Sequence, residues 1–250
     1  MKAAIKLFTL LLIVNLTSCV LDDHGVPPTQ VRIVKRETVG YGTYTYNYDE
    51  TNRLAKETFS PATAITPYYY DFTAFDSANR LLEAIQYFTA FPDLGHEVLR
   101  DPDGKITRIR KYCVGGPTCT SGIWYFAYPT ANTVEVEFWD NGSLFRGTQV
   151  YTFNSAGQIV ETKSFNSADE LTRTRVNTSF DDKRNMFSYY PEGFSTSPAA
   201  NNNALTYQVT DHTTGTTTDG SVSYEYNSQG WVTKQIIMGE VVEIFEFESY

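Results

Sequence analysis

The chain contains 250 residues and is acidic, with 29 Asp and Glu residues against 20 Lys and Arg residues and a formal net charge of −9. A protein this acidic lacks the basic surface that nucleic acids attract, so the composition excludes a nucleic-acid partner. Anionic lipid surfaces should also repel the bulk of the chain.

The N-terminal segment has the features of an export signal. Lys2 and Lys6 form a basic start, and residues 7–16 form an apolar stretch that is too short to span a bilayer comfortably as a helix. Residues 16–19, with the sequence Leu-Thr-Ser-Cys, resemble a bacterial lipobox. The resemblance implies cleavage before Cys19 and a diacylglycerol on its sulfur. The alternative is an ordinary signal peptide followed by an incidental cysteine.

We therefore predict three segments: a lipoprotein signal peptide over residues 1–18, a flexible tether over residues 19–30 and a single β domain over residues 31–250. The acyl chains would supply the membrane affinity, at about 0.8 kcal/mol for each buried CH₂ group. Asp22-Asp23 is similar to the acidic export signals of surface lipoproteins in Bacteroidetes-type bacteria, and a solvated linker explains the two carboxylates equally well. The expected location is the outer membrane, on its periplasmic or its cell-surface face.

Beyond the tether, the sequence alternates between apolar and polar residues with the period of a β-strand rather than that of a helix. Tyr44, Tyr46 and Tyr48 share one strand face, and Glu135 and Glu137 lie opposite an apolar face. Thr, Val, Tyr and Phe dominate these runs, and they suit a pleated, half-buried surface. The pattern predicts an all-β domain.

One sequence phrase recurs: an aromatic strand end, Asp or Asn, two small or polar residues, Gly or Asn, and then a polar and an aliphatic residue. Its clearest copies occupy residues 46–54, 75–81, 153–159 and 226–232. The Asp or Asn can accept hydrogen bonds from backbone amides two residues further on, and the Gly or Asn tolerates a left-handed conformation. We therefore predict a hairpin turn at each copy, with the aromatic and the aliphatic residue near each other across the strands.

Weaker turn signals lie between these copies. Three dipeptides are typical of hairpins: Asp103-Gly104, Asn141-Gly142 and Asp219-Gly220. Three segments look like degenerate copies of the phrase: residues 101–106, 140–144 and 180–184. Residues 195–204 are rich in Ser, Asn and Ala, and we interpret them as a protruding loop rather than a linker. Strands resume afterwards, and the last pair should form a hairpin across Gly239.

The copy at residues 46–54 is similar to the tyrosine-aspartate (RHS-type) repeat, whose pattern is Tyr-x-Tyr-Asp-x-x-Gly-Arg-Leu. Together with the lipobox, it makes the chain resemble uncharacterised lipoproteins of Bacteroidetes-type bacteria that carry such repeats in a porin-like sheet. The copies are unevenly spaced, which argues against the closed shell of long regular arrays. The expected fold is an antiparallel meander of repeated hairpins that forms a large curled, porin-like or open-barrel sheet. The resemblance implies no reaction.

Two cysteines remain besides Cys19. Cys113 and Cys119 bracket a Gly- and Pro-containing segment that can only be a tight turn or loop. In an oxidising envelope the simplest interpretation of such a pair is a disulfide, worth roughly 2 kcal/mol for so short a loop. A redox pair would more often show two-residue spacing, and a metal site would need further ligands. We therefore expect no metal.

The sequence contains no nucleophile elbow, metal-binding helix, phosphate loop or dinucleotide fingerprint, so we expect neither a catalytic residue nor a cofactor. Aromatic residues are abundant, and Trp124, Tyr125 and Trp231 are candidate stacking platforms for a ligand. Aromatic ladders in a broad sheet explain the same residues. The leading hypothesis is a non-enzymatic envelope lipoprotein that acts as a structural or interaction module with an unknown protein or glycan partner. The alternative is a carbohydrate- or peptide-binding lipoprotein accessory to an uptake system.

Overall fold

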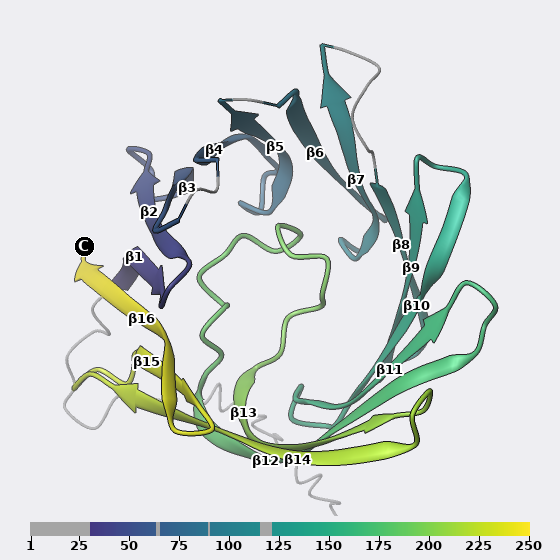
Figure 1. Cartoon of the computed structure of the whole chain (residues 1–250). Coiled ribbons are helices and arrows are strands. Elements are labelled where there is room, and N and C mark those ends of the chain that lie inside the picture. Colours follow the sequence, from purple (N-terminus) through teal and green to yellow (C-terminus); the bar gives the residue numbers. More distant parts are fainter. Residues whose placement is uncertain (1–30, 64–65, 90, 116–121) are drawn as a thin grey trace, which may run out of the picture.

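The computed structural model describes residues 31–63, 66–89, 91–115 and 122–250. These residues form sixteen antiparallel strands that close into one barrel (Figure 1). The predicted all-β meander is therefore confirmed, and of the two forms expected the sheet takes the closed one. Across the described ranges, no helix is long and apolar enough to cross a membrane.

The strands follow one another round the barrel in chain order. They are β1 (Val31–Thr38), β2 (Gly42–Tyr48), β3 (Leu54–Pro61), β4 (Tyr68–Phe75), β5 (Leu81–Phe88), β6 (Asp93–Arg100), β7 (Ile106–Val114), β8 (Gly122–Thr130), β9 (Thr133–Asp140), β10 (Leu144–Phe153), β11 (Ile159–Asn166), β12 (Leu171–Arg184), β13 (Asn202–Asp211), β14 (Thr216–Tyr226), β15 (Val232–Ile237) and β16 (Glu240–Ser249). The predicted final hairpin across Gly239 is confirmed as β15 and β16.

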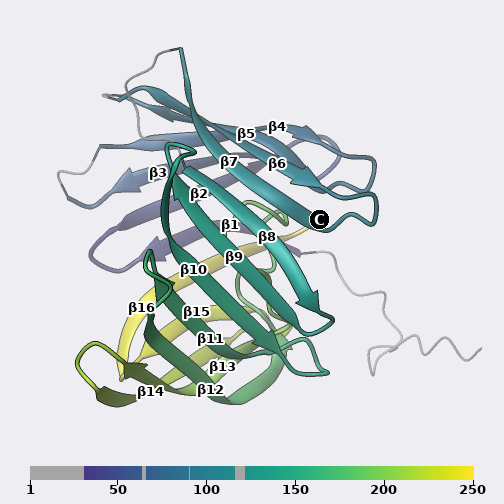
Figure 2. The ribbon, with the colours of Figure 1, turned by 90° about the vertical axis from the view of Figure 1, so that its right-hand side faces the viewer.

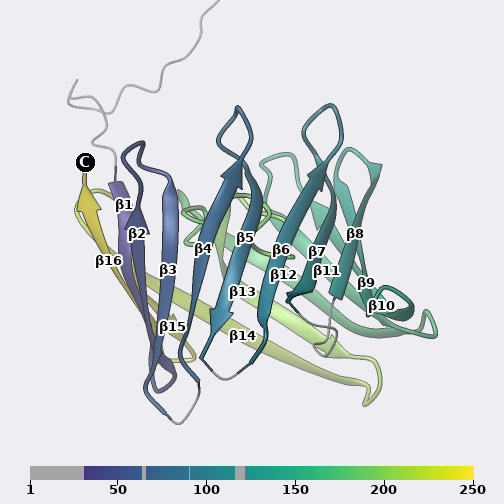
Figure 3. The same ribbon diagram turned by 90° about the horizontal axis from the view of Figure 1, so that it is seen from above.

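The barrel closes where β1 pairs with β16, with Val31 opposite Ser249. The strands run obliquely round the wall, as Figure 2 shows for β8 to β11. Because Val31 pairs with Ser249, the first described residue and the end of the chain lie at the same end of the barrel. We call this end the termini rim and the opposite end the far rim. The turns β2–β3, β4–β5 and β6–β7 lie at the termini rim, on the same side as the C-terminus (Figure 3).

The repeated phrase forms one turn geometry in six places. The turns begin at Asp49, Asp76, Asp101, Asn154, Asn166 and Asn227. In each, the side-chain oxygen of this first residue accepts a hydrogen bond from the amide four residues on. The fourth residue has a positive φ in every turn, for example 61° at Asn52 and 74° at Gly157. The predicted role of the Asp or Asn and of the Gly or Asn is therefore confirmed.

The residues that flank these turns pair as predicted. Tyr48 lies opposite Leu54 and Tyr226 lies opposite Val232, and the copies at residues 75–81 and 153–159 repeat the arrangement. The turn at Asn166 was missed because Asp169 stands where the phrase has Gly or Asn, although Leu171 follows in the expected aliphatic place, opposite Phe165. Asn141-Gly142 forms the predicted β9–β10 turn, with φ of 50° and 69°.

Two of the weaker turn predictions are wrong. Asp219 and Gly220 lie inside β14, where Gly220 pairs with Tyr207 of β13. A Cβ atom on Gly220 would collide with the Tyr207 ring, so this glycine makes room for an aromatic side chain rather than for a turn. Residues 180–184 form the end of β12, and Asp181 there accepts hydrogen bonds from the backbone and side chain of Asn203.

The predicted protruding loop at residues 195–204 is also wrong. Residues 185–201 connect β12 to β13 and fold into the centre of the barrel (Figure 1). We call them the lumen segment. Three of their aromatic residues, Tyr189, Tyr190 and Phe194, lie upstream of the predicted loop and pack against the inner wall. The polar composition of residues 195–204 does not indicate a position inside the barrel, because the apolar contacts come from residues 186–194.

Contacts with the lumen segment identify the inner face of each strand. Tyr46, Tyr70 and Phe72 meet aromatic residues of the lumen segment, and residues paired with them in register share the same face. The inner face holds most of the buried apolar residues. They include Tyr44, Phe59, Leu81, Val98, Ile109, Phe126, Val136, Tyr151, Val222 and Phe245. The lumen is therefore an aromatic-rich core along most of the wall, whereas the inward positions of β11 and β12 are polar, for example Thr162, Ser164 and Arg175.

The outer face is polar and carries ion pairs. Charged side chains pair across neighbouring strands on the part of the wall that runs from β14 through β16 and β1 to β7. The pairs include Lys35–Glu246 at 2.7 Å, Lys56–Asp71 at 3.7 Å, Arg110–Glu97 at 3.2 Å and Lys234–Glu225 at 2.8 Å. Threonines fill many of the remaining outer positions, for example Thr45 opposite Thr58 and Thr210 opposite Thr217. Glu135 and Glu137 lie on this face, opposite the inward Val134 and Val136, as predicted.

Candidate functional site: the barrel lumen

The lumen segment is held by a cluster of aromatic rings. Phe194 meets Tyr70 and Phe72 with ring centroids 5.0 Å apart, and it stacks on Tyr190 at 5.3 Å. The hydroxyl groups of Tyr190 and Tyr46 lie 2.5 Å apart, within hydrogen-bonding distance. Because large aromatic side chains contribute several kcal/mol each when buried, these contacts fix the segment across the lumen.

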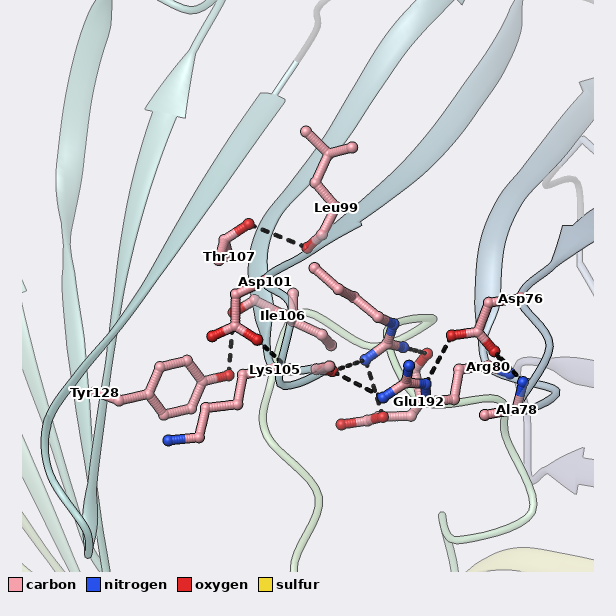
Figure 4. Close-up of polar contacts among 12 residues, drawn as sticks. Asp76, Ala78, Arg80, Leu99, Asp101, Lys105, Ile106, Thr107, Tyr128 and Glu192 are labelled. Carbon is pink, nitrogen blue, oxygen red and sulfur yellow. Dashed lines mark hydrogen bonds and ion pairs between the residues drawn. The ribbon is translucent and has the colours of Figure 1, made fainter.

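A charged contact ties the tip of the lumen segment to the termini rim. Arg100 at the end of β6 donates to the Glu192 carboxylate at 3.0 Å and to the Glu192 carbonyl at 2.8 Å (Figure 4). Arg100 and Arg80 also both donate to the carbonyl of Gly104 in the β6–β7 turn, at 3.1 and 3.2 Å. Two of the repeated turns thus help to position the guanidinium that binds the lumen segment.

His96 of β6 contacts the lumen segment from inside the wall. Its side chain is 1% exposed, and its Nε2 lies 2.8 Å from the carbonyl of Gly193. A carbonyl oxygen only accepts, so Nε2 carries the proton and Nδ1 is the bare nitrogen. Burial, together with the nearby charge of Lys111, lowers the pKa of His96 to about 4. The imidazole is therefore neutral at neutral pH.

A second polar cluster lies between β1, β3 and β16. The Arg36 guanidinium lies 4.0 Å from the centre of the Tyr44 ring and 3.9 Å from the Glu243 carboxylate. Glu57 is 3% exposed, and burial raises its pKa while the charge of Arg36 opposes the rise. Burial raises the pKa of Glu243 in the same way. The charge of Arg36 thus acts on two carboxyl groups, the buried Glu57 and the partly buried Glu243.

These two carboxyl groups have raised pKa values, as general acids of glycosidases do. Hydrolysis also requires that a substrate reach both groups. Glu57 faces Tyr46 in register and Tyr70 on its other side, so packed rings flank it. Neither Glu57 nor Glu243 lines either of the two cavities described below. The geometry therefore favours a structural role for this cluster.

Two cavities adjoin the wall. The first, of about 240 Å³, lies inside the barrel between β12–β15 and the start of the lumen segment. The second, of about 310 Å³, lies at the far rim and is lined by β3, β4 and β5, including the stacked rings of Tyr69 and Tyr87. The first combines apolar and polar walls, and it is the more enclosed. Among the described residues, no group of three or more His, Cys, Asp or Glu side chains could hold a metal ion.

The three candidate platform residues lie in different environments. Trp124 faces inward and stacks on Phe138 with centroids 4.8 Å apart. Tyr125 faces outward and is 41% exposed, opposite Glu137. Trp231 packs against Phe247 and against Tyr189 of the lumen segment, both at 5.7 Å. The structure thus does not bring them together into one site, and a ligand role for any of them stays a prediction.

The predicted cysteine sites fall partly outside the structure. Cys19 and the signal and tether segments lie outside the described residues, as does Cys119. Cys113 lies near the far-rim end of β7, opposite Leu94 of β6. The lipid attachment and the Cys113–Cys119 disulfide therefore stay predictions.

Sequence reasoning missed Arg36, Glu57, His96 and Glu243. A signal was present, because Glu57 shares a strand face with Phe59, and Glu243 shares one with Phe245. Charged residues on an otherwise apolar face are candidates for burial. The search for catalytic motifs did not identify these four residues.

The fold has counterparts among solved structures. The crystal structure of a porin-like protein from Bacteroides vulgatus ATCC 8482 matches with a TM-score of 0.54 at 10% identity, over 87% of this chain and 98% of that chain. A porin-like protein from Bacteroides uniformis ATCC 8492 matches with a TM-score of 0.39 at 12% identity, over 89% and 99% of the two chains. No family model and no curated protein matches the sequence. The chain thus has the fold of a porin-like closed antiparallel β-barrel, and the identity is too low to transfer more than the fold.

Proposed function

We propose that this chain is a non-enzymatic lipoprotein of the bacterial cell envelope. Acyl chains on Cys19 hold it to the outer membrane, and the barrel lies outside the bilayer as a structural or interaction module. The observation that carries the proposal is the distribution of polar side chains between the two faces of the barrel wall.

The outer face is unsuited to lipid. A membrane-spanning barrel presents an apolar band about 25 Å tall, and a single Lys or Arg at its midplane costs about 2–4 kcal/mol. Here Lys56, Arg110 and Lys234 all lie on the outer face with carboxylate partners. Most of the buried apolar residues face the lumen instead. Over most of the wall, the polarity is thus the reverse of that in a lipid-embedded porin.

The lumen supports the same conclusion. A pore needs an aqueous passage, whereas aromatic side chains of the lumen segment pack against β2, β4 and β6. The membrane anchor must then come from elsewhere, and the lipobox at residues 16–19 offers one. The repeated turns serve as scaffold, because each of their residues has a sufficient role in the hairpin.

The anchor can be tested separately from the barrel. The Cys19→Ser variant should lose labelling by radioactive palmitate in bacterial cells. Labelling that persists in the variant would contradict the lipoprotein assignment.

The predicted Cys113–Cys119 disulfide can be tested in the same preparations, because both thiols should resist alkylation until a reductant is added. Alkylation of either thiol in unreduced protein would refute it.

The position of the barrel is tested by replacing residues 1–19 with a cleavable secretory signal that lacks a lipobox cysteine. We expect the exported barrel to appear in the soluble periplasmic fraction, folded without detergent. A membrane-spanning barrel would instead stay in the membrane pellet and need detergent for extraction. That second result would overturn the proposal that the barrel lies outside the bilayer, whatever the palmitate experiment shows.

A further inference from the structure

The cavity inside the barrel has a charged residue in an otherwise neutral wall. Arg175 of β12 lines it together with Met186, Tyr207, Val222 and Gln235. The remaining lining residues are Asn185, Phe187, Asn203, Ala204, Tyr224 and Ile237, so no carboxylate faces the cavity. The wall thus offers apolar surface, amide groups and one guanidinium.

The guanidinium is held in a fixed position. It lies 3.9 Å from the centre of the Tyr207 ring, and its Nε donates to the side chain of Asn177 at 2.9 Å. The Tyr207 ring in turn lies over Gly220 on the neighbouring strand, where a side chain would displace it. Glycine, tyrosine and arginine therefore form a stack across three strands that presents the guanidinium to the cavity.

The positive charge of Arg175 is not neutralised. Within the described ranges, Arg175 forms no ion pair, and its two terminal amino groups donate to no protein acceptor. The like charge of Arg173 also acts on it. Burial of the group lowers the pKa of Arg175, which shows that water only partly solvates its charge. Arg175 is partly buried, and a charge withdrawn from water is normally paired, so the missing partner is a feature to explain.

We propose that this cavity binds a small carboxylic acid with a short apolar tail. The carboxylate accepts from the two free amino groups of Arg175, and the tail lies against Val222, Ile237 and Met186. Guanidinium and carboxylate match in geometry and form two parallel hydrogen bonds. The inference goes beyond the proposed envelope function and does not depend on the membrane anchor.

The size of the cavity limits the ligand. The cavity volume of about 240 Å³ is below that of a drug-sized pocket, which begins at about 300 Å³, so the cavity suits a small ligand. Hexanoate, with six carbon and two oxygen atoms, fits this limit. It is therefore the probe of choice, and hexanamide is its uncharged counterpart of the same shape.

The test is titration calorimetry of the purified full chain with each probe. We expect hexanoate to bind, and hexanamide to bind at least about tenfold more weakly, because a hydrogen bond to a charged group contributes about 1.5–3 kcal/mol. Arg175→Gln should weaken hexanoate to the level of hexanamide. Lys163→Gln removes the same charge from the outer side of the neighbouring strand β11, and it should leave both affinities within about twofold.

A second variant tests the proposal independently, in case Arg175→Gln does not fold. Val222→Phe keeps Arg175 but fills the cavity, and it should abolish binding of both probes while the circular dichroism spectrum and cooperative melting are retained. Equal affinity for hexanoate and hexanamide would overturn the proposal, as would hexanoate binding that survives Arg175→Gln. Failure of hexanoate to bind the wild-type chain would overturn it as well.

Discussion

The two faces of the barrel wall are built from the same strands and yet are stabilised by different forces. On the inner face, Phe59 is fully buried and contacts the rings of Tyr41, Tyr44 and Tyr68. On the outer face, one residue away, Thr58 pairs with Thr45 of the next strand. Burial of a large aromatic side chain contributes several kcal/mol, whereas exposed polar pairs contribute about 0–1 kcal/mol each. The stability of this barrel therefore resides mainly in its lumen.

The largest effect should come from removing an inner ring. Phe59→Ala should lower the free energy of unfolding by about 3–5 kcal/mol, because it leaves a cavity in the aromatic cluster. The neighbouring outer substitution Thr58→Ala should change it by less than about 1 kcal/mol. Denaturant titration of both variants measures the difference. Equal losses at the two positions would show that the faces do not differ as described.

A second test uses the pH dependence of the inner face. The pKa of His96 falls from 6.5 to about 4 on folding. The unfolded chain therefore binds a proton that the folded chain excludes, so this contribution to stability is complete above about pH 6.5 and is lost as the pH falls towards 4. Its full size is about 3 kcal/mol. The difference in unfolding free energy between wild type and His96→Gln should shrink by most of this amount between pH 7 and pH 4.5.

The difference between the two proteins is the quantity to measure, because other inner groups titrate in the opposite sense. Burial raises the pKa values of Glu57 and Glu243, so their contributions increase as the pH falls. These contributions are common to wild type and variant and cancel. A difference that stays constant with pH would show that His96 is not buried as a neutral imidazole.

The repeated turns should give an intermediate effect. The side-chain oxygen of Asn227 accepts from the amides of Gln229 and Trp231, each at 3.0 Å. Asn227→Ala removes both bonds and should cost about 1 kcal/mol, whereas Asn227→Asp keeps the acceptor and should cost less. Thermal unfolding of the two variants provides the comparison. An alanine variant as stable as the aspartate variant would mean that these side-chain bonds contribute little.

The smallest effect should come from an outer ion pair. Lys234→Gln breaks the contact with Glu225 and should change the unfolding free energy by no more than about 0.5 kcal/mol in physiological salt. The same denaturant titration detects it. A loss above 2 kcal/mol would show that outer ion pairs stabilise the wall as much as inner rings do.

The sequence predicted the local structure of the wall because local rules dictate it. Asp49 with Asn52, or Asn227 with Gly230, specify a turn from within five residues. The alternation of Val134 and Val136 with two glutamates likewise separates the faces of one strand. Local rules do not say which face curves inward. An apolar face of this kind lines the lumen here, whereas in a lipid-embedded barrel it would face the membrane.

The lumen was less predictable because it depends on contacts between residues that are distant in sequence. Phe194 meets Phe72 across about half of the chain, and Glu192 meets Arg100 across 92 positions. Gly220 looked like a turn residue beside Asp219, and only its pairing with Tyr207 explains it. Glu57 could have been recognised, because it shares a strand face with Phe59. That pattern predicts a buried charge but not its partner Arg36.

The pairing of β1 with β16 also constrains how the protein can form. Lys35 and Glu246 are 211 positions apart, and their strands can meet only after β16 has been synthesised. Until then, β1 and the last strand formed each expose an unpaired edge, which is a site for pairing with other chains. Contacts of such long sequence separation make folding slow. We therefore expect the newly made chain to depend on chaperones until β16 joins the first strand.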